Sequence, residues 1–162
     1  MSRIVSFRRM EDGTREDYLL LDESERDFAA GLPDRVLDAL GKLDNSLAGY
    51  PVSRLEHSLQ TATRAHRDGR DEAYVVMALL HDIGDTLGTF NHPEVAASII
   101  KPFVSEEVHW ICENHGHFQG YYYFHYLGMD QHSREQFRDN PFFDACAEFC
   151  EEYDQAAFDP AY

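Results

Sequence analysis

The segment Ala78-Leu79-Leu80-His81-Asp82-Ile83-Gly84-Asp85 places an adjacent histidine and aspartate directly after a run of apolar residues. We interpret His81 and Asp82 as the centre of a metal site, because a buried carboxylate beside a buried imidazole is costly unless a bound cation compensates it. The alternative is a solvated helix end, since about one His-Asp pair is expected by chance in a chain with this many histidines and aspartates.

The residues around this pair predict a buried helix that carries it near its end. Asp71 is a suitable N-cap and Gly84 a suitable C-cap. Apolar residues recur between them at helical spacing, at Tyr74, Val75, Ala78 and Leu79. We therefore expect His81 and Asp82 in the last turn of this helix.

Histidines and aspartates of other expected helices complete a candidate ligand set: His57, His81, Asp82, His92, His115 and Asp154. Imidazoles and carboxylates suit iron, manganese, zinc or nickel better than calcium. We expect Asp82 to bridge two ions about 3.5 to 4 Å apart, with His57 and Asp154 on one and His92 and His115 on the other. Each histidine alone is more often a core residue, and spacing alone would allow His109 or His117 to replace His115.

Residues 1–48 are expected to form N-terminal helices. Thr14-Arg15-Glu16-Asp17 resembles a capping box and opens a helix that should run to Ala30. Pro33 opens the next, which should end before the turn-rich stretch 44–51.

Residues 50–155 are expected to form the metal-binding core. Ser53-Arg54-Leu55-Glu56 is a capping box, and its helix should bury a stripe of Leu55, Leu59 and Ala62. Further helices are expected after the N-caps Asn91 and Ser105, the latter ending near 115–116, then over 121–127, where a strand is the alternative, and over 131–138 and 141–154. The fold class is therefore all-α, in a single domain over residues 1–162.

Composition restricts the class of protein and its partners. Acidic residues outnumber basic ones by 30 to 14, and the formal charge of −16 disfavours nucleic acid and anionic membranes. No apolar run reaches the roughly 18 residues of a membrane span and no signal peptide is evident, so we expect a cytoplasmic protein. The 3 cysteines fit reduced thiols. No closing helix follows Asp159-Pro160, which leaves open a longer native chain.

The order and spacing of the candidate ligands resemble the HD-domain superfamily, whose signature is a histidine, a later His-Asp pair and a distant aspartate. His92 and His115 fit its dinuclear branch, which contains phosphohydrolases and mixed-valent diiron oxygenases. The resemblance implies an HD-type helical bundle around a dinuclear metal site. It also implies two iron ions, Fe(II)/Fe(III), or alternatively Mn, Ni, Zn or Mg.

The string Leu55-Glu56-His57-Ser58-Leu59-Gln60 is similar to the first-ligand segment of oxygenases that cleave carbon–phosphorus bonds in hydroxylated aminoethylphosphonates. In that group Gln60 would support a ligand or contact the substrate. Tyr50 would cap the open iron position until substrate binds, although the loop is shorter here and lacks the matching glutamate.

Three residues depart from the anion site of these relatives, because Asp85, Gln119 and Glu151 stand where the relatives carry basic residues. A phosphonate would meet like charge at Asp85 and Glu151, at a cost of about 1 kcal/mol or more each. The aromatic run Tyr121, Tyr122, Tyr123, Phe124 and Tyr126 could instead accept a quaternary ammonium group, although such a run is more often core. We expect Tyr50, Gln60 and Asp85 in catalysis and Gln60, Asp85, Gln119 and Tyr122 at the substrate.

The resulting functional expectation is an HD-domain diiron oxygenase that uses O₂ to cleave a small hydroxylated substrate, such as a (trimethyl)ammonio-hydroxyphosphonate. By resemblance, hydrogen would be taken from the carbon that bears a metal-bound hydroxyl. One alternative is a metal-dependent phosphohydrolase acting on a nucleotide or phosphoester, in which the metals lower the pKa of a bridging water. Another is a metal-stabilised regulatory protein that has lost catalysis. The sequence leaves the oligomeric state open.

Overall fold

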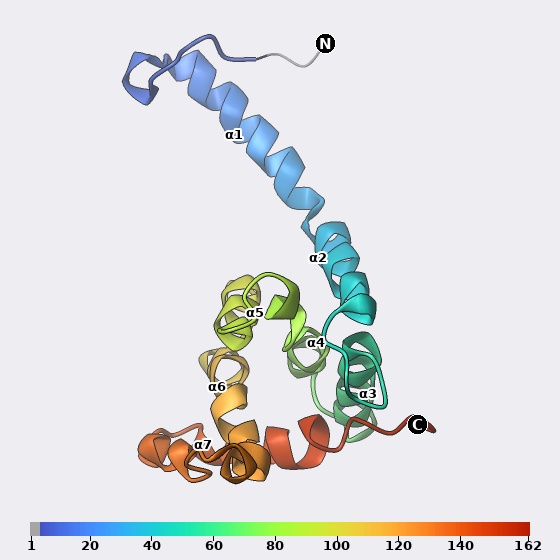
Figure 1. Ribbon diagram of the computed structural model, residues 1–162. Helices are drawn as coiled ribbons and strands as arrows, with labels where there is room; N and C mark the ends of the chain where they lie inside the picture. The colour runs from blue at the N-terminus through green and yellow to red at the C-terminus, as the bar shows by residue number, and fades with distance from the viewer. Residues whose placement is uncertain (1–3) are drawn as a thin grey trace. The chain divides into compact units, whose positions relative to one another are not determined.

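The computed structural model describes residues 4–162, which are helical with no β-strand among them (Figure 1), and this confirms the all-α class. The chain divides into two compact units, one up to Ala39 and a larger one over Leu40–Tyr162. None of the described helices combines the length and the apolar character that a membrane span requires. The organisation as a single domain over 1–162 stays a prediction.

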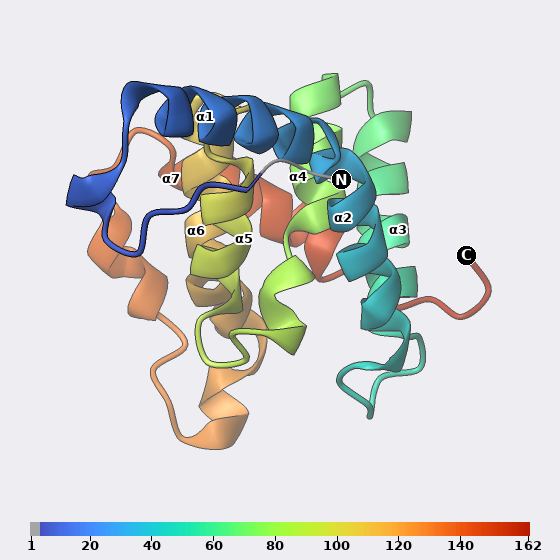
Figure 2. The ribbon, with the colours of Figure 1, turned by 90° about the horizontal axis from the view of Figure 1, so that it is seen from above.

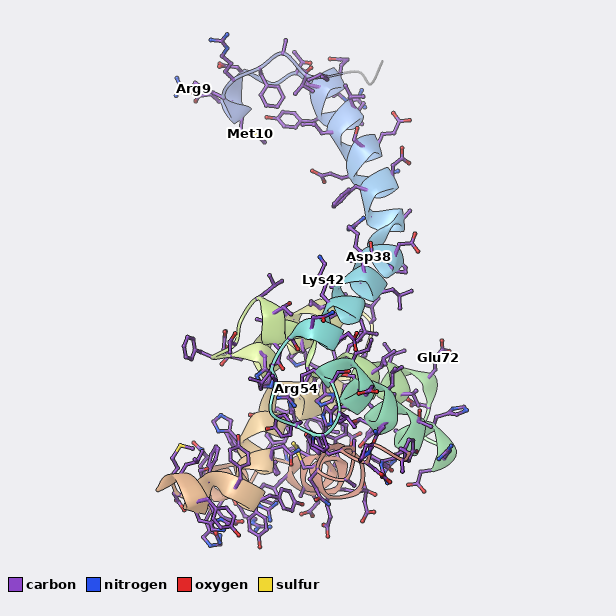
Figure 3. All side chains as sticks on the ribbon, turned by 45° about the vertical axis from the view of Figure 1, so that its right-hand side comes forward. Arg9, Met10, Asp38, Lys42, Arg54 and Glu72 are labelled. Atoms are coloured by element: carbon purple, nitrogen blue, oxygen red, sulfur yellow. The ribbon has the colours of Figure 1, made fainter. Side chains whose placement is uncertain are left out.

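The N-terminal unit begins with a short 3₁₀ helix, Met10–Asp12, followed by α1, Arg15–Ala30. The predicted capping box is present, because the Asp17 amide donates to the Thr14 hydroxyl and the Asp17 carboxylate accepts from the Thr14 amide. Helix α2, Leu32–Gly41, follows and crosses the division between the units. No residue of α1 is buried, and Figure 3 shows its side chains on the ribbon below Arg9 and Met10.

The larger unit contains α3 (Arg54–Arg67), α4 (Glu72–Leu80), α5 (His92–Ile100), α6 (Glu106–Tyr123) and α7 (Phe143–Glu148). Helix α3 packs on α4 and α5 packs on α6 (Figure 2). A short 3₁₀ segment precedes α3, at Lys42–Asn45; others lie between α4 and α5, at Ile83–Thr86, and between α6 and α7, at Phe124–Leu127 and Ser133–Phe137. The largest buried apolar side chains are Leu43, Met77, Ile111, Phe118 and Phe149.

Helix α3 buries a polar face rather than the predicted apolar stripe. The Ser53–Glu56 capping box is present, as expected. However, Leu59 is 48% exposed, whereas His57, Ser58 and Thr61 are inaccessible to solvent. Of the predicted stripe, Ala62 is buried as expected and Leu55 is partly buried, but the prediction was wrong at Leu59. Helix α3 faces a polar centre, and there His57 rather than Leu59 points inward.

Helix α4 ends at Leu80, earlier than predicted. His81 is its C-cap, and Asp82 already lies outside it with φ −101° and ψ 6°. Gly84 is therefore not the C-cap that the sequence suggested. A Cβ at Gly84 would lie 2.8 Å from the Cα of His92, so this glycine lets the turn after α4 approach the start of α5.

Helix α6 continues past the predicted end at 115–116 and runs to Tyr123. Gly116 does not stop it, because this glycine faces α5, where a Cβ would lie 3.2 Å from Pro93 Cγ. The tyrosine-rich stretch is helical, as favoured, with α6 followed by a 3₁₀ turn.

The last predicted helix, 141–154, is two elements, α7 and a π-helix over Phe149–Asp154. A π-helix holds one extra residue per hydrogen-bonded turn and is commonly found at functional sites. The wider turn here ends at Asp154, one of the candidate ligands, whose side chain is buried.

The contact at Gly84 predicts a specific effect of adding one methyl group. Gly84→Ala should destabilise the protein by about 1 to 3 kcal/mol, because the Cβ forces the turn away from His92. Gly41→Ala is the matched control, since a Cβ there meets nothing within 4 Å and should be neutral or stabilising. Urea unfolding of the three proteins checks this, and equal stability of the two variants would contradict the close approach.

Candidate metal centre

All six predicted ligands converge within the larger unit. His57 comes from α3, His81 and Asp82 from the end of α4, His92 from the start of α5, His115 from α6 and Asp154 from the π-helix. Their side chains are buried except for that of His92, which is 22% exposed. Three overlapping groups of these residues and Asp85 bring their donor atoms within 4.8 Å of one another.

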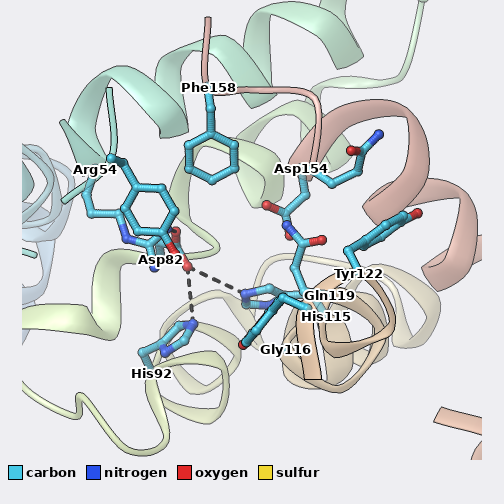
Figure 4. Close-up of a pocket in the computed structure, with 12 residues that line it drawn as sticks. Arg54, Asp82, His92, His115, Gly116, Gln119, Tyr122, Asp154 and Phe158 are labelled. Carbon is cyan, nitrogen blue, oxygen red and sulfur yellow. Dashed lines mark ion pairs between the residues drawn. The ribbon is translucent and has the colours of Figure 1, made fainter. Parts of the chain in front are cut away.

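The carboxylate of Asp82 lies between two pairs of imidazoles. Its Oδ1 is 3.2 Å from His92 Nε2 and 3.5 Å from His115 Nε2, the two contacts drawn in Figure 4. Its Oδ2 is 3.5 Å from His57 Nε2 and 3.4 Å from His81 Nε2. Asp154 Oδ1 joins the second pair, at 3.2 Å from His57 Nε2 and 3.7 Å from His81 Nε2.

The contacts of the Nδ1 atoms determine which nitrogen of each of the four imidazole rings carries the proton. A backbone carbonyl can only accept, so an Nδ1 atom bonded to one must carry the proton, and the lone pair on Nε2 then points to the centre. This arrangement is typical of metal-binding histidines. The Nδ1 partners are Ala157 O for His57 (3.0 Å), Ala78 O for His81 (2.8 Å), Cys112 O for His115 (2.7 Å) and, as an ion-pair contact, Asp85 Oδ1 for His92 (3.3 Å).

Two buried carboxylate oxygens at the centre accept no hydrogen bond from residues 4–162, namely Asp82 Oδ2 and Asp154 Oδ2. Asp82 Oδ2 has the guanidinium group of Arg54 as an ion-pair partner, at 3.2 Å from Nη1. His57 Nε2 and His81 Nε2 are 3.1 Å apart, and with both Nδ1 atoms protonated their lone pairs face each other. A cation between these atoms would compensate each of them, so the donor set fits metal ions.

In the metal-free protein, a proton on His81 compensates part of the negative charge of Asp82 and Asp154. Burial disfavours the charged imidazole of His81, but Asp82 and Asp154 outweigh burial and raise its pKa to about 9. Burial raises the pKa of a carboxyl group, yet His57 and His81 hold that of Asp154 well below its usual range. Burial lowers the pKa of His115, and the neighbouring His81 lowers it further, so that together they outweigh the opposite effect of Asp82 and Asp154. The metal-free centre therefore stabilises one imidazolium.

Arg54 was missed by the sequence analysis. Its Nε lies 2.9 Å from Asp85 Oδ2 and its Nη1 3.2 Å from Asp82 Oδ2, and its side chain is 13% exposed. Figure 4 shows Arg54 beside Asp82. The sequence analysis expected Asp85 to present a free carboxylate to the substrate. In the structure this carboxylate instead faces Arg54 and His92. Arg54 lies one turn before His57 on α3, and this spacing was the available signal.

A pocket of about 270 Å³ opens beside Asp82, His92, His115 and Asp154 (Figure 4). Three of the predicted substrate or catalytic residues line it, namely Tyr50, Gln119 and Tyr122, as do Arg54 and Phe158. Burial raises the pKa of Tyr122 to about 12, so its hydroxyl stays protonated. Gln119 Oε1 is buried without a hydrogen bond from the described residues.

Other predicted residues lie elsewhere. Gln60 does not line this pocket, because its amide hydrogen-bonds the backbone of Asp159. Glu151 is exposed and outside the pocket. Of the aromatic run, only Tyr122 and Tyr123 line the pocket. Asp85 and Glu151 are therefore not placed to bind a cationic substrate, whereas Tyr122 and Tyr123 are.

Comparison with known proteins gives two findings. The HD domain family matches residues 54–141, more than half of the chain. The 1-hydroxy-2-(trimethylamino)ethylphosphonate dioxygenase (glycine-betaine-forming) of Leisingera caerulea is 34% identical over 88 residues, which cover 48% of this chain and 42% of the relative. The chain thus aligns with less than half the length of this curated relative.

The raised pKa of His81 predicts how the stability of the metal-free protein depends on pH. Protonated His81 stabilises the fold fully below the ordinary pKa of about 6.5, and this contribution is lost as pH rises toward 9. His115, whose pKa is lowered, changes stability only below about 6.5. Urea unfolding of the metal-free protein should therefore show stability falling by on the order of a few kcal/mol between pH 6.5 and 9.

The metal-loaded protein is the control for this measurement. Metal binding requires a neutral His81, so the loaded protein should show no such decrease over the same pH range. A metal-free protein whose stability stays constant or rises through this range would contradict the imidazolium at His81.

Proposed function

The chain belongs to the HD domain family, and we propose that its histidine–aspartate cluster holds two iron ions and that the protein is an oxygenase acting on a small hydroxylated compound. The position of Asp82 carries this proposal. Each of its oxygens faces its own pair of imidazole Nε2 atoms, as a bridging carboxylate requires. The relative named as a dioxygenase supports oxygen chemistry rather than hydrolysis.

The proposed ligands separate into two groups around Asp82. His57, His81 and Asp154 would serve one ion, and His92 and His115 the other. Bound iron would supply the reaction with O₂, and the protein would supply position and charge. Asp85 would orient His92 through its Nδ1 atom, and Arg54 would balance the charge of both aspartates.

The pocket next to this cluster has the size and surface for a small substrate. A volume of about 270 Å³ is near the lower end of ligand pockets in proteins, roughly 300 to 1,000 Å³. Tyr122 can donate a hydrogen bond and Gln119 can accept one there. Because Arg54 is already engaged by Asp82 and Asp85, an anionic group on the substrate would depend on the metals.

The substrate class that we propose is a hydroxylated compound with a methylated ammonium group. The relative is named for a trimethylamino hydroxyphosphonate. Aromatic rings line the pocket of this chain at Tyr50, Tyr122, Tyr123 and Phe158, and quaternary ammonium groups bind aromatic faces with about 0.5 to 2 kcal/mol per contact. Asp85 and Glu151 no longer contribute to this argument.

The alternative function is a metal-dependent phosphohydrolase of the same family. The same donor set would suit it, because two metals can lower the pKa of a water and polarise a phosphate. Arg54 lines the pocket and could contact a phosphate oxygen if it moved from one of its carboxylates. Oxygen dependence separates the two functions.

The test compares turnover with and without O₂. Protein purified anaerobically and loaded with iron should consume O₂ in the presence of 1-hydroxy-2-(trimethylamino)ethylphosphonate and release phosphate. The same protein should not hydrolyse nucleotides or phosphoesters when loaded with Mn²⁺ or Ni²⁺ without O₂. Hydrolysis at an ordinary enzymatic rate of about 1 s⁻¹ or more under those anaerobic conditions would instead support the phosphohydrolase.

A further inference from the structure

Residues 155–162 form a segment of turns and irregular backbone that follows the π-helix, and we call it the C-terminal strap. It forms hydrogen bonds with three side chains of α3, those of His57, Gln60 and Arg67. The bonded residues are 100, 99 and 95 positions apart in the sequence. The strap reaches the pocket through Phe158, whose ring points into it in Figure 4.

Gln60 binds the strap with both ends of its amide. Its Nε2 donates to the carbonyl oxygen of Asp159 at 2.7 Å, and its Oε1 accepts from the Asp159 amide at 3.1 Å. The side chain is buried, with 7% of the residue exposed. Two hydrogen bonds to one backbone residue fix both the position and the direction of the strap.

Tyr162 provides a second attachment. Its hydroxyl accepts a hydrogen bond from Arg67 Nη1 at 2.9 Å. The guanidinium groups of Arg64 and Arg67 lie over its ring, 4.8 and 5.0 Å from the centroid. This attachment is more exposed than the one at Gln60, since Tyr162 is 43% exposed.

The strap contacts His57 just before Asp159. The carbonyl oxygen of Ala157 accepts from His57 Nδ1 at 3.0 Å. The ring of Phe158 stacks on the His57 ring, with centroids 4.4 Å apart and an angle of 19° between the planes. Phe158 also stacks on Tyr50, at 4.9 Å. The strap therefore fixes both the proton and the plane of His57.

We propose that Gln60 is a positioning residue of the metal centre, which acts through the strap to hold His57 in its ligating orientation. This inference rests on the proposed role of His57 as a metal ligand. A chain of contacts connects Gln60 to the metal centre. Gln60 fixes Asp159, and the adjacent residues Phe158 and Ala157 contact His57. His57 Nε2 in turn faces Asp82 and Asp154. Gln60 thus acts on the metal without touching metal or substrate.

The experiment uses the whole chain, purified anaerobically and loaded with Fe(II). Gln60→Leu removes both hydrogen bonds while keeping a side chain of similar size. Gln136→Leu is the matched control, because Gln136 is exposed and its amide donates to the nearby Ser133 O, away from the strap and the metal centre. Amide hydrogen exchange at Asp159 reports the strap, and the rate of iron loss to a chelator reports the metal centre.

In Gln60→Leu, exchange at Asp159 should be about tenfold faster, because its amide loses a hydrogen bond in the folded protein. Iron should be lost about tenfold or more faster, the range for outer contacts of metal-binding histidines. Tyr162→Leu, a change at a half-exposed residue, should accelerate both rates by a smaller factor and provides a test if Gln60→Leu folds poorly. The control should match the wild type.

Two results are distinguished from these. Faster exchange with an unchanged rate of iron loss would show that Gln60 only fastens the strap, and would overturn the inference while leaving the proposed function intact. A wild-type protein that binds no iron would overturn the proposed function, and the inference with it.

Discussion

The rest of this structure depends on one buried carboxylate that serves two sets of histidines. Asp82 has each oxygen within 3.5 Å of two imidazole Nε2 atoms, and it is 2% exposed. Burial of an uncompensated carboxylate is costly, so the surrounding elements must bring cations or protons to it. The chain meets this requirement with Arg54 and His81 and, in our account, with two metal ions. Helix α4 ends at Leu80 with His81 as its C-cap, so Asp82 lies just outside the helix.

The same requirement explains why a hydrophobic pattern is weak around the centre. Helix α3 turns polar side chains inward, and its leucine at position 59 faces solvent. The Nδ1 atom of each imidazole contacts an oxygen atom on the side away from the centre. Three of these oxygens are backbone carbonyls, and the fourth belongs to the Asp85 carboxylate. A buried donor or acceptor without a partner costs about 1 to 3 kcal/mol, so these outer contacts leave only the inward-facing atoms to be compensated by a metal. The polar interior therefore imposes both the ring orientations and the need for a cation.

Local signals predicted much of this from the sequence. The capping boxes at Thr14 and Ser53 identified two helix starts correctly. The six candidate ligands were selected because histidines and aspartates recur across several expected helices, and the structure brings these side chains together. Long-range partners were not predictable. Whether Asp85 is a free carboxylate depends on Arg54, which the fold brings from another helix. The end of α4 and the π-helix at Asp154 likewise follow from the site they form, not from local propensity.

The most direct measurement of the central claim is a crystal structure of anaerobically purified protein, with anomalous scattering recorded on both sides of the iron edge. We predict two iron peaks about 3.5 to 4 Å apart with Asp82 between them. His57, His81 and Asp154 should surround one peak, and His92 and His115 the other. A single peak, or a distance of more than about 5 Å from either His92 or His115 to any peak, would contradict a dinuclear centre bridged by Asp82.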